Sequence, residues 1–133
     1  MTFLLDTSAL SSLMRDDSPT ANWVASIQPV DRVIICTIVR GEILFGLTRL
    51  AEGRRHQELK SRAEGLFQLF ACESVRPEVG DVYAGLKNTQ QRRGFALAEN
   101  DLWIAATAIA INATLVSLDG DFVRIEGLSL VRP

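Results

Sequence analysis

Short apolar segments that alternate with helical patterns constrain the fold of this chain more than any other feature. Thr2–Leu5, Val33–Cys36 and Thr114–Leu118 are apolar or β-branched runs of a length typical of buried strands. A short extended piece at Glu73–Val75 and an edge strand at Leu128–Val131 complete the set. Strands that alternate with helices form βαβ units. The predicted fold class is therefore α/β, with a mostly parallel sheet covered by helices on both faces.

Helical periodicity is found in each stretch between these strands. The segment Asp101–Asn112, which Asn100 is expected to cap, is apolar almost all round and must be deeply buried. The helix after the second strand is expected to take Thr37 as its N-cap. The other predicted helices are Ser8–Met14, one begun by Ser18 and Pro19, an amphipathic helix with apolar positions from Leu59 to Phe70, and one from Pro77 to Gly94.

Length and composition indicate one globular domain over residues 1–133, because 47% of the residues are hydrophobic and 23% charged. The longest uncharged apolar stretch, Leu102–Ile111, is too short to cross a membrane. The N-terminus has no basic segment typical of a signal peptide, so a cytoplasmic protein is expected. Cys36 and Cys72 lie far apart without a CxxC pattern, which argues against a zinc site and predicts two reduced core thiols.

The net charge of −2 limits the kinds of partner. Proteins that grip a long nucleic-acid duplex by its phosphates are usually basic, whereas this chain has 14 basic and 16 acidic residues. This near-equal number of acidic and basic residues remains compatible with an enzyme that uses metal ions to neutralise a single phosphate group of its substrate. It is equally compatible with a chain that spends much of its time bound to another protein.

Acidic residues fall where a parallel α/β sheet binds its ligands, beyond the carboxyl ends of the strands. Asp6 follows the first predicted strand and Asp119 follows the Thr114–Leu118 strand. Asp101 begins the most hydrophobic helix. Each acid alone is equally well explained as a strand end, a helix cap or a turn residue, but together they are expected to meet at one edge of the sheet.

Glu42 is a fourth acid, on the helix that follows the second strand. Ile38 lies four residues before it and Phe45 three residues after it, so the carboxylate lies among apolar neighbours on one helical face. A surface position with the carboxylate extended to water is the alternative for this residue taken alone. A carboxylate in such an apolar setting otherwise requires a compensating partner.

Four converging carboxylates require a compensating cation. Two carboxylates about 4 Å apart repel by roughly 4 kcal/mol at an effective dielectric constant near 20. Oxygen ligands select Mg²⁺, Mn²⁺ or Ca²⁺ rather than zinc. A site with one or two such metals can activate water for in-line attack on phosphorus, and no nucleophilic side chain is then needed.

Four segments of the chain resemble the PIN-domain nucleases and, within them, the VapC-type toxins of bacterial toxin–antitoxin pairs, including the FitB-like members. The segments occur in the order found in that family and together span essentially the whole chain. "Leu-Asp-Thr-Ser" alone is weak, whereas the four in series are specific. They are residues Phe3–Ser8, Thr37–Gly46, Asn100–Ala106 and Leu115–Phe122.

The resemblance implies a PIN-like three-layer fold, with a mostly parallel five-stranded sheet between helices, and a role for each matched residue. Three acids would be the core metal ligands, a fourth would occupy a more variable position, and a further aspartate two residues later would share or replace that role. Hydroxyl groups would support the carboxylates or metal-bound waters. The core acids are Asp6, Glu42 and Asp101, the variable acids are Asp119 and Asp121, and the hydroxyl positions are Thr7 or Ser8 and Ser117.

The same resemblance implies an activity and partners. The chain would be an endoribonuclease dependent on Mg²⁺ or Mn²⁺ that cleaves structured RNA, often transfer or ribosomal RNA. It would form a homodimer and a larger assembly with a cognate VapB-like antitoxin whose tail enters the active-site groove. The helical region from Arg49 to Phe70 would contribute to that surface, although an ordinary solvated helix face explains any single residue there equally well.

Rival functions require residues that are absent or displaced. A phosphatase of the haloacid dehalogenase type would need a second aspartate where Ser8 stands, and a receiver domain matches poorly. The single histidine, His56, lies on the polar side of a predicted helix, which argues against serine or cysteine hydrolases. The remaining alternative is a catalytically inactive PIN-like binding or regulatory protein, although an inactive scaffold has no reason to keep four repelling carboxylates together.

Overall fold

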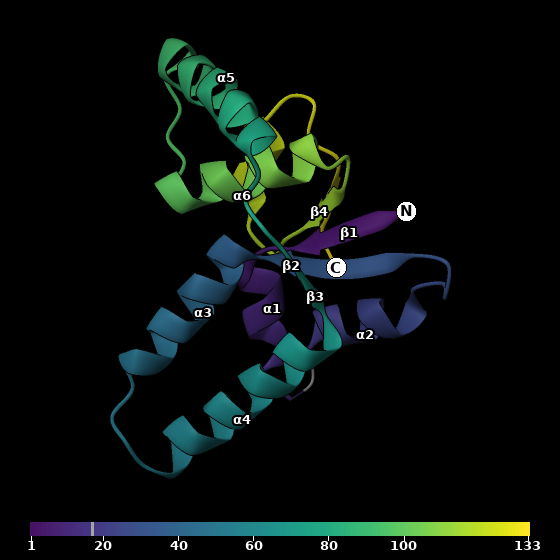
Figure 1. The fold of residues 1–133 in the computed structure, drawn as a ribbon, viewed down its shortest axis with the longest axis vertical. Coiled ribbons are helices and arrows are strands. Elements are labelled where there is room, and N and C mark those ends of the chain that lie inside the picture. Colours follow the sequence, from purple (N-terminus) through teal and green to yellow (C-terminus); the bar gives the residue numbers. More distant parts are fainter. Residues whose placement is uncertain (17) are drawn as a thin grey trace.

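The computed structural model describes residues 1–16 and 18–133, and its centre is an entirely parallel five-stranded sheet (Figure 1). The strand order is β3-β2-β1-β4-β5, and every neighbouring pair is parallel. The predicted α/β class is therefore confirmed. The strands are β1 (Thr2–Leu5), β2 (Arg32–Cys36), β3 (Ala71–Glu73), β4 (Thr114–Val116) and β5 (Leu130–Val131).

Helices cover both faces of the sheet. Figure 1 shows α5 and α6 on one side and α1, α2 and α4 on the other. Helix α3 packs against α1 and α4 and also reaches α6. The helices are α1 (Thr7–Leu13), α2 (Pro19–Ser26), α3 (Thr37–Thr48), α4 (Arg54–Leu69), α5 (Pro77–Arg93) and α6 (Glu99–Ala110), and a 3₁₀ turn η1 spans Gly120–Arg124.

Only β1 has the predicted bounds. Strand β2 begins one residue earlier than predicted, at Arg32, and β5 begins two residues later, at Leu130. The third strand is Ala71–Glu73 rather than Glu73–Val75, because Cys72 and Glu73 pair with Ile35 and Cys36 of β2. The fourth strand ends at Val116 instead of Leu118. Beyond Val116, one backbone bond to β5 remains, from the Ser117 N–H to the Val131 carbonyl at 3.1 Å, and side-chain hydrogen bonds then direct the chain.

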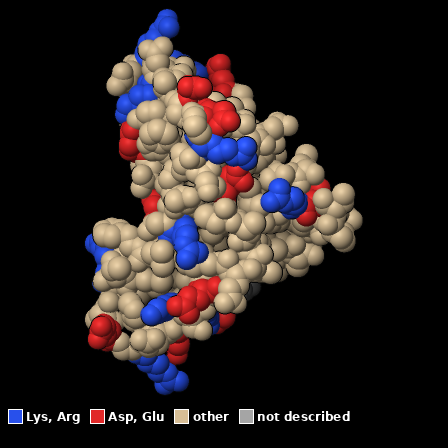
Figure 2. All heavy atoms as spheres, in the orientation of Figure 1, with Lys and Arg blue, Asp and Glu red and all other residues tan. Residues whose placement is uncertain are grey.

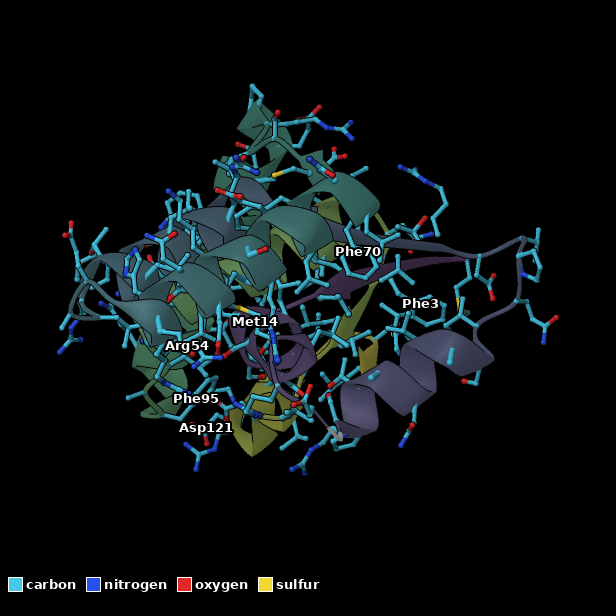
Figure 3. The ribbon with its side chains drawn as sticks, turned by 90° about the horizontal axis from the view of Figure 1, so that it is seen from below. Phe3, Met14, Arg54, Phe70, Phe95 and Asp121 are labelled. Atoms are coloured by element: carbon cyan, nitrogen blue, oxygen red, sulfur yellow. The ribbon has the colours of Figure 1, made fainter. Side chains whose placement is uncertain are left out.

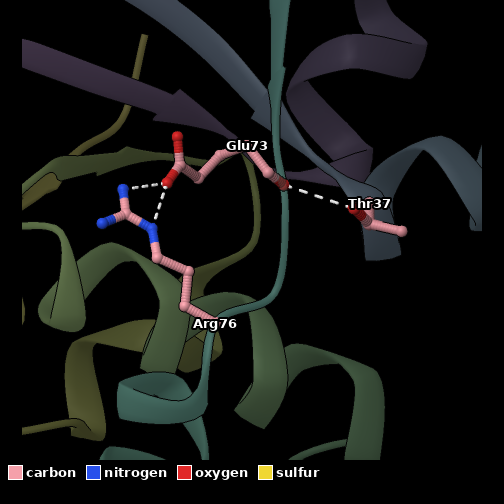
Figure 4. Close-up of polar contacts among 3 residues, drawn as sticks. All are labelled: Thr37, Glu73 and Arg76. Atoms are coloured by element: carbon pink, nitrogen blue, oxygen red, sulfur yellow. Dashed lines mark hydrogen bonds and ion pairs between the residues drawn. The ribbon is translucent and has the colours of Figure 1, made fainter.

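Two predicted helix caps are confirmed and two are wrong. Ser18 accepts a hydrogen bond from the Ala21 N–H, and Gly94 ends α5 with a φ of 72°, a conformation that glycine adopts without strain. Thr37 does not cap α3, since its hydroxyl donates to the Glu73 carbonyl of β3 at 3.3 Å (Figure 4). Asn100 does not cap α6, because the helix already begins at Glu99.

The core lies between the central strands and the helices on each face. Leu4, Leu5 and Ile35 are fully buried on β1 and β2. Figure 3 shows Phe3 beside α2, where its ring meets Trp23 edge to face with centroids 5.0 Å apart. The buried face of α6 is rich in alanine, and this helix packs against α5, α3 and β4.

The cysteines lie in different environments, and both are free thiols. Cys36 is buried at the end of β2, as predicted. Cys72 is exposed, so the expectation of a core position was wrong for it: it lies on β3, which is an edge strand of the sheet. Among the helices of the described residues, none is long and apolar enough to cross a membrane.

Candidate functional site

Asp6 lies at the carboxyl end of β1, where the chain turns directly into α1. Its carboxylate is only 3% exposed. Oδ1 accepts hydrogen bonds from the Ala9 N–H at 2.8 Å and from the Ser8 hydroxyl at 2.7 Å, while Oδ2 accepts one from the Ser117 hydroxyl. Asp6 is thus the N-cap of α1, and its other carboxylate oxygen is held by Ser117 just beyond β4.

The surroundings of Asp6 hold it in place without supplying a positive charge. Burial raises the pKa of the Asp6 carboxyl, the hydrogen bonds from Ser117, Ala9 and Ser8 oppose that rise, and the charge of Asp119 adds to it. The pKa is raised in total, because neutral donors compensate only part of the lost hydration. An ionised Asp6 is therefore expected to be stabilised by a nearby cation.

Glu42 reaches the same end of the sheet from α3. Its Oε1 accepts a 2.6 Å hydrogen bond from the hydroxyl of Thr7, the first residue of α1. Ile38 and Phe45 lie beside it, as predicted, in a groove of about 530 Å³. Gly41, Thr7 and Asn100 complete the lining of that groove.

Asp101 shows most directly that the acids share one environment. It is the third residue of α6 and is half-buried. The pKa of Asp101 is raised to about 6, first by burial and then, in decreasing order, by the negative charges of Glu42, Asp119, Asp6 and Asp121. Acids that follow β1, lie on α3 and follow β4 therefore act on one carboxyl group of α6.

The segment after β4 brings Asp119 and Asp121 to the site. The Ser117 hydroxyl accepts a 2.9 Å hydrogen bond from the Asp119 N–H while it donates to Asp6. Asp119 caps η1 by accepting a 2.9 Å hydrogen bond from the Asp121 N–H. Asp119 is half-buried, whereas Asp121 is exposed at the surface (Figure 3).

The predicted acids are brought to one edge of the sheet, and no basic side chain neutralises them. Within residues 1–16 and 18–133, the ion pairs all involve other carboxylates. The predicted hydroxyls Thr7, Ser8 and Ser117 all contact these acids. Across the face drawn in Figure 2, acidic and basic side chains are interspersed, in keeping with the small net charge.

The donor set fits a hydrated divalent cation better than a closed metal cage. In the described part of the chain, no three His, Cys, Asp or Glu side chains are close enough to hold an ion by direct contact. Mg²⁺ characteristically keeps several waters and takes only one or two carboxylates from the protein. The carboxylate oxygens of these residues are donors of the kind that such binding uses.

Glu73 is an acid at this edge that the sequence reasoning did not assign to the site. It follows Cys72 at the carboxyl end of β3, and its carboxylate binds the Arg76 guanidinium (Figure 4). The sequence prediction placed this strand at Glu73–Val75, two residues too late, so Glu73 was taken as its first residue and not as an acid at its carboxyl end. With its charge paired, Glu73 differs from the unpaired acids of the central strands.

His56 lies apart from the acids. It is half-buried rather than solvated, because it lines a hollow between α3 and α4 together with Arg40 and Lys60. Its Nδ1 is buried and has no hydrogen-bond partner among the described residues. The hollow shares no lining residue with the groove at Glu42, so His56 is not a member of the acidic site.

Comparison with known proteins gives a consistent result over nearly the full length. The model of the PIN domain family matches residues 3–128. A relative from Haemophilus influenzae named Ribonuclease VapC1 is 30% identical over 131 residues, covering 96% of this chain and 95% of that protein.

Solved structures agree with the fold. The VapBC-1 structure from nontypeable Haemophilus influenzae contains a chain with a TM-score of 0.85 and 26% identity, covering 98% of this chain and 97% of that one. A chain of VapBC2 from Rickettsia felis, bound to a DNA fragment from its promoter, has a TM-score of 0.89 at 23% identity, with 98% of both chains covered.

Proposed function

Because this chain belongs to the PIN domain family and resembles its VapC ribonucleases throughout, we propose that it is an endoribonuclease that hydrolyses RNA with Mg²⁺ or Mn²⁺. One observation carries the proposal: after burial, the carboxylates of Glu42, Asp119, Asp6 and Asp121 together raise the pKa of Asp101, and no ion pair within residues 1–16 and 18–133 neutralises any of these acids. Such an arrangement is costly for a metal-free protein and is relieved by a divalent cation.

Each side chain has a distinct part in this proposal. Asp6 is held rigidly by three donors and offers the best-oriented carboxylate. Glu42, aligned by Thr7, faces the groove from α3. Asp101 is supplied by α6, and Asp119 by the segment after β4. When bound, the cation would activate a water for attack on phosphorus and stabilise the charge on the leaving oxygen.

Water rather than a side chain is the proposed nucleophile. The hydroxyls of Ser8 and Ser117 donate to Asp6, and the hydroxyl of Thr7 donates to Glu42, so each supports a carboxylate. The single histidine, His56, lines a different hollow. A Ser-His or Cys-His nucleophile pair is therefore not part of the mechanism.

The proposed partner is a VapB-like antitoxin, in an assembly that also contains a second copy of this chain. Support comes from α3, where Leu44 and Phe45 are 41% and 63% exposed although both are large and apolar. Phe45 lines the same groove as Glu42. A protein segment that covers Phe45 would therefore also lie over Glu42 and hinder the approach of RNA.

Cleavage assays on purified protein test the proposed function. The wild type should cleave structured cellular RNA in millimolar Mg²⁺ or Mn²⁺ and stop when EDTA is added. Glu42→Gln removes a charge from the site and should lose at least 100-fold in rate, by analogy with other groups that position catalytic charge. Glu52→Gln is the matched control, because Glu52 is exposed and lies outside the lining of the groove.

The alternative is a catalytically inactive PIN-like binding or regulatory protein. It predicts that the wild type cuts no cellular RNA with any divalent ion, and that Glu42→Gln and Glu52→Gln behave alike. Cleavage that persists in EDTA or in Glu42→Gln would instead indicate a contaminating nuclease and remove the support for the proposal.

A further inference from the structure

Arg132 lies at the same edge of the sheet as the acids, because β5 is parallel to β4. Val131, the last residue of β5, pairs with Val116 of β4, and its carbonyl accepts the Ser117 N–H at 3.1 Å. Arg132 comes directly after this strand. The fold therefore places a basic residue beside the segment that carries Asp119.

The guanidinium of Arg132 lies against the backbone between the two variable acids. Its Nη2 is 3.5 Å from the Leu118 carbonyl oxygen. A Cβ built on Gly120 would be 3.6 Å from Nη1, so the group rests on the residue that separates Asp119 from Asp121. A contact as long as 3.5 Å is weak and leaves most of the five guanidinium donors for another acceptor.

Arg132, which follows the outer strand β5, differs in one respect from Arg76, which follows the other outer strand, β3. Arg76, just beyond β3, is occupied by an ion pair with Glu73 (Figure 4). Arg132 forms no ion pair with a carboxylate in the part of the chain that the structure describes. An exposed guanidinium beside unpaired acids is thus available to an anion that approaches from solvent.

We propose that Arg132 binds a phosphate group of the RNA strand at the rim of the acidic site. The inference rests on the proposed ribonuclease function and adds to it a substrate-binding residue. The acids repel a phosphodiester, so a fixed positive charge next to them lowers the cost of bringing the strand in. Guanidinium groups bind phosphate oxygens through two parallel N–H donors, which also restricts the orientation of the strand.

The salt dependence of RNA binding tests this role. The probe is a fluorescein-labelled single-stranded RNA of ten mixed-sequence nucleotides, and fluorescence polarisation measures its affinity at several salt concentrations. Asp101→Asn is the common background, so that the probe is not cleaved during the measurement. Arg132→Gln removes the charge but keeps a donor for the Leu118 carbonyl, whereas Arg132→Lys keeps the charge. Arg55→Gln is the control, because Arg55 is an exposed arginine on α4.

We expect Arg132→Gln to weaken binding by about tenfold, the usual effect of losing one charged hydrogen bond. The slope of log K against log salt should fall by about 0.7, the value for one phosphate contact on a single strand. Arg132→Lys should retain most of the slope, and Arg55→Gln should match the background. A second measurement uses proteins that keep Asp101. There, adding Mn²⁺ should raise the Tm of Arg132→Gln by as much as it raises the Tm of the wild type.

Each other result has a definite meaning. If the RNA binds and the slope for Arg132→Gln equals that for Arg55→Gln, the role of Arg132 is refuted while the ribonuclease proposal stands. If Arg132→Gln also abolishes the Mn²⁺-dependent shift in Tm, the residue supports the Asp119 segment instead of contacting RNA. If neither the wild type nor Asp101→Asn binds RNA, the proposed function fails and this inference falls with it.

Discussion

The Thr7 hydroxyl donates a 2.6 Å hydrogen bond to Oε1 of Glu42 and thereby joins the start of α1 to a carboxylate on α3. Asp6, the residue before Thr7, caps the same helix. One turn of α1 thus positions two acids of the site, Asp6 by helix capping and Glu42 through the Thr7 hydroxyl. The orientation of Glu42 therefore depends on a residue 35 positions earlier in the chain.

Thr7→Val tests whether this contact aligns Glu42. Valine keeps the shape of threonine but has no hydroxyl, so Glu42 loses the hydrogen bond that it accepts from Thr7. We expect Mn²⁺ affinity and RNA cleavage to fall by about 10- to 100-fold, as for other groups that orient metal ligands. Thr7→Ser should retain most activity. Equal loss in both variants would show that the methyl group, and not the hydroxyl, matters.

Ser117 supports Asp6 from the end of β4, and Ser117→Ala tests the energetic value of that support. The residue is fully buried, and its hydroxyl contacts both Asp6 and the Asp119 N–H. Without it, the buried Asp6 carboxylate and the partly buried Asp119 N–H each lose a partner, so the free energy of unfolding should fall by about 1–3 kcal/mol in urea titrations. Ser26→Ala, at an exposed position on α2, should change it by less than about 0.5 kcal/mol. A Ser117 variant as stable as the control would contradict this assignment.

Asp119 and Asp121 are expected to contribute unequally to metal binding. Both charges raise the pKa of Asp101, but Asp119 has the larger effect and is half-buried, whereas Asp121 is exposed. Thermal melts with and without millimolar Mn²⁺ should show that Asp119→Asn loses more than half of the wild-type increase in Tm. Asp101→Asn should lose most of it, and Asp121→Asn should keep most of it. A larger loss for Asp121→Asn would assign the fourth ligand to Asp121.

The sequence was sufficient to predict the sheet and the acids that follow its strands. Asp6 and Asp119 each come directly after a predicted buried run, and parallel strands bring their carboxyl ends to one edge. Glu42 and Asp101 were harder, because a helical position alone does not specify which neighbour a carboxylate faces. Their apolar settings nevertheless placed them among the four converging acids, the family resemblance then implied that they bind metal, and the raised pKa of Asp101 supports their proximity.

The details that the sequence did not predict all depend on contacts between distant segments. It left open whether Thr7 or Ser8 supports the site, whereas in the structure Thr7 serves Glu42 and Ser8 serves Asp6. Which hydroxyl meets which acid depends on how α1 is rotated against α3. Thr37 was expected to be a cap, but the neighbouring strand β3 offered its hydroxyl the Glu73 carbonyl instead.

The raised pKa of Asp101 predicts how pH affects the metal-free protein. The pKa is about 6 in the folded state and near 3.8 in the unfolded chain, so the folded state binds more protons between these values. The free energy of unfolding should therefore fall as pH rises from about 4 to about 6 and change little from this source above that range. Solvent screens this half-exposed group, so we expect a contribution of only about 1 kcal/mol.

Urea titrations of wild type and Asp101→Asn at pH 4, 5, 6 and 7 isolate this contribution, because the other acids titrate in both proteins. Relative to Asp101→Asn, the wild type should lose stability on going from pH 4 to pH 7 without metal. Mn²⁺ should cancel that loss at pH 7 but not at pH 5, where protons compete with the ion for the carboxylate. A difference between the two proteins that is independent of pH would mean that Asp101 is not held in a shared field of negative charge, and the reason for a cation at this edge would disappear.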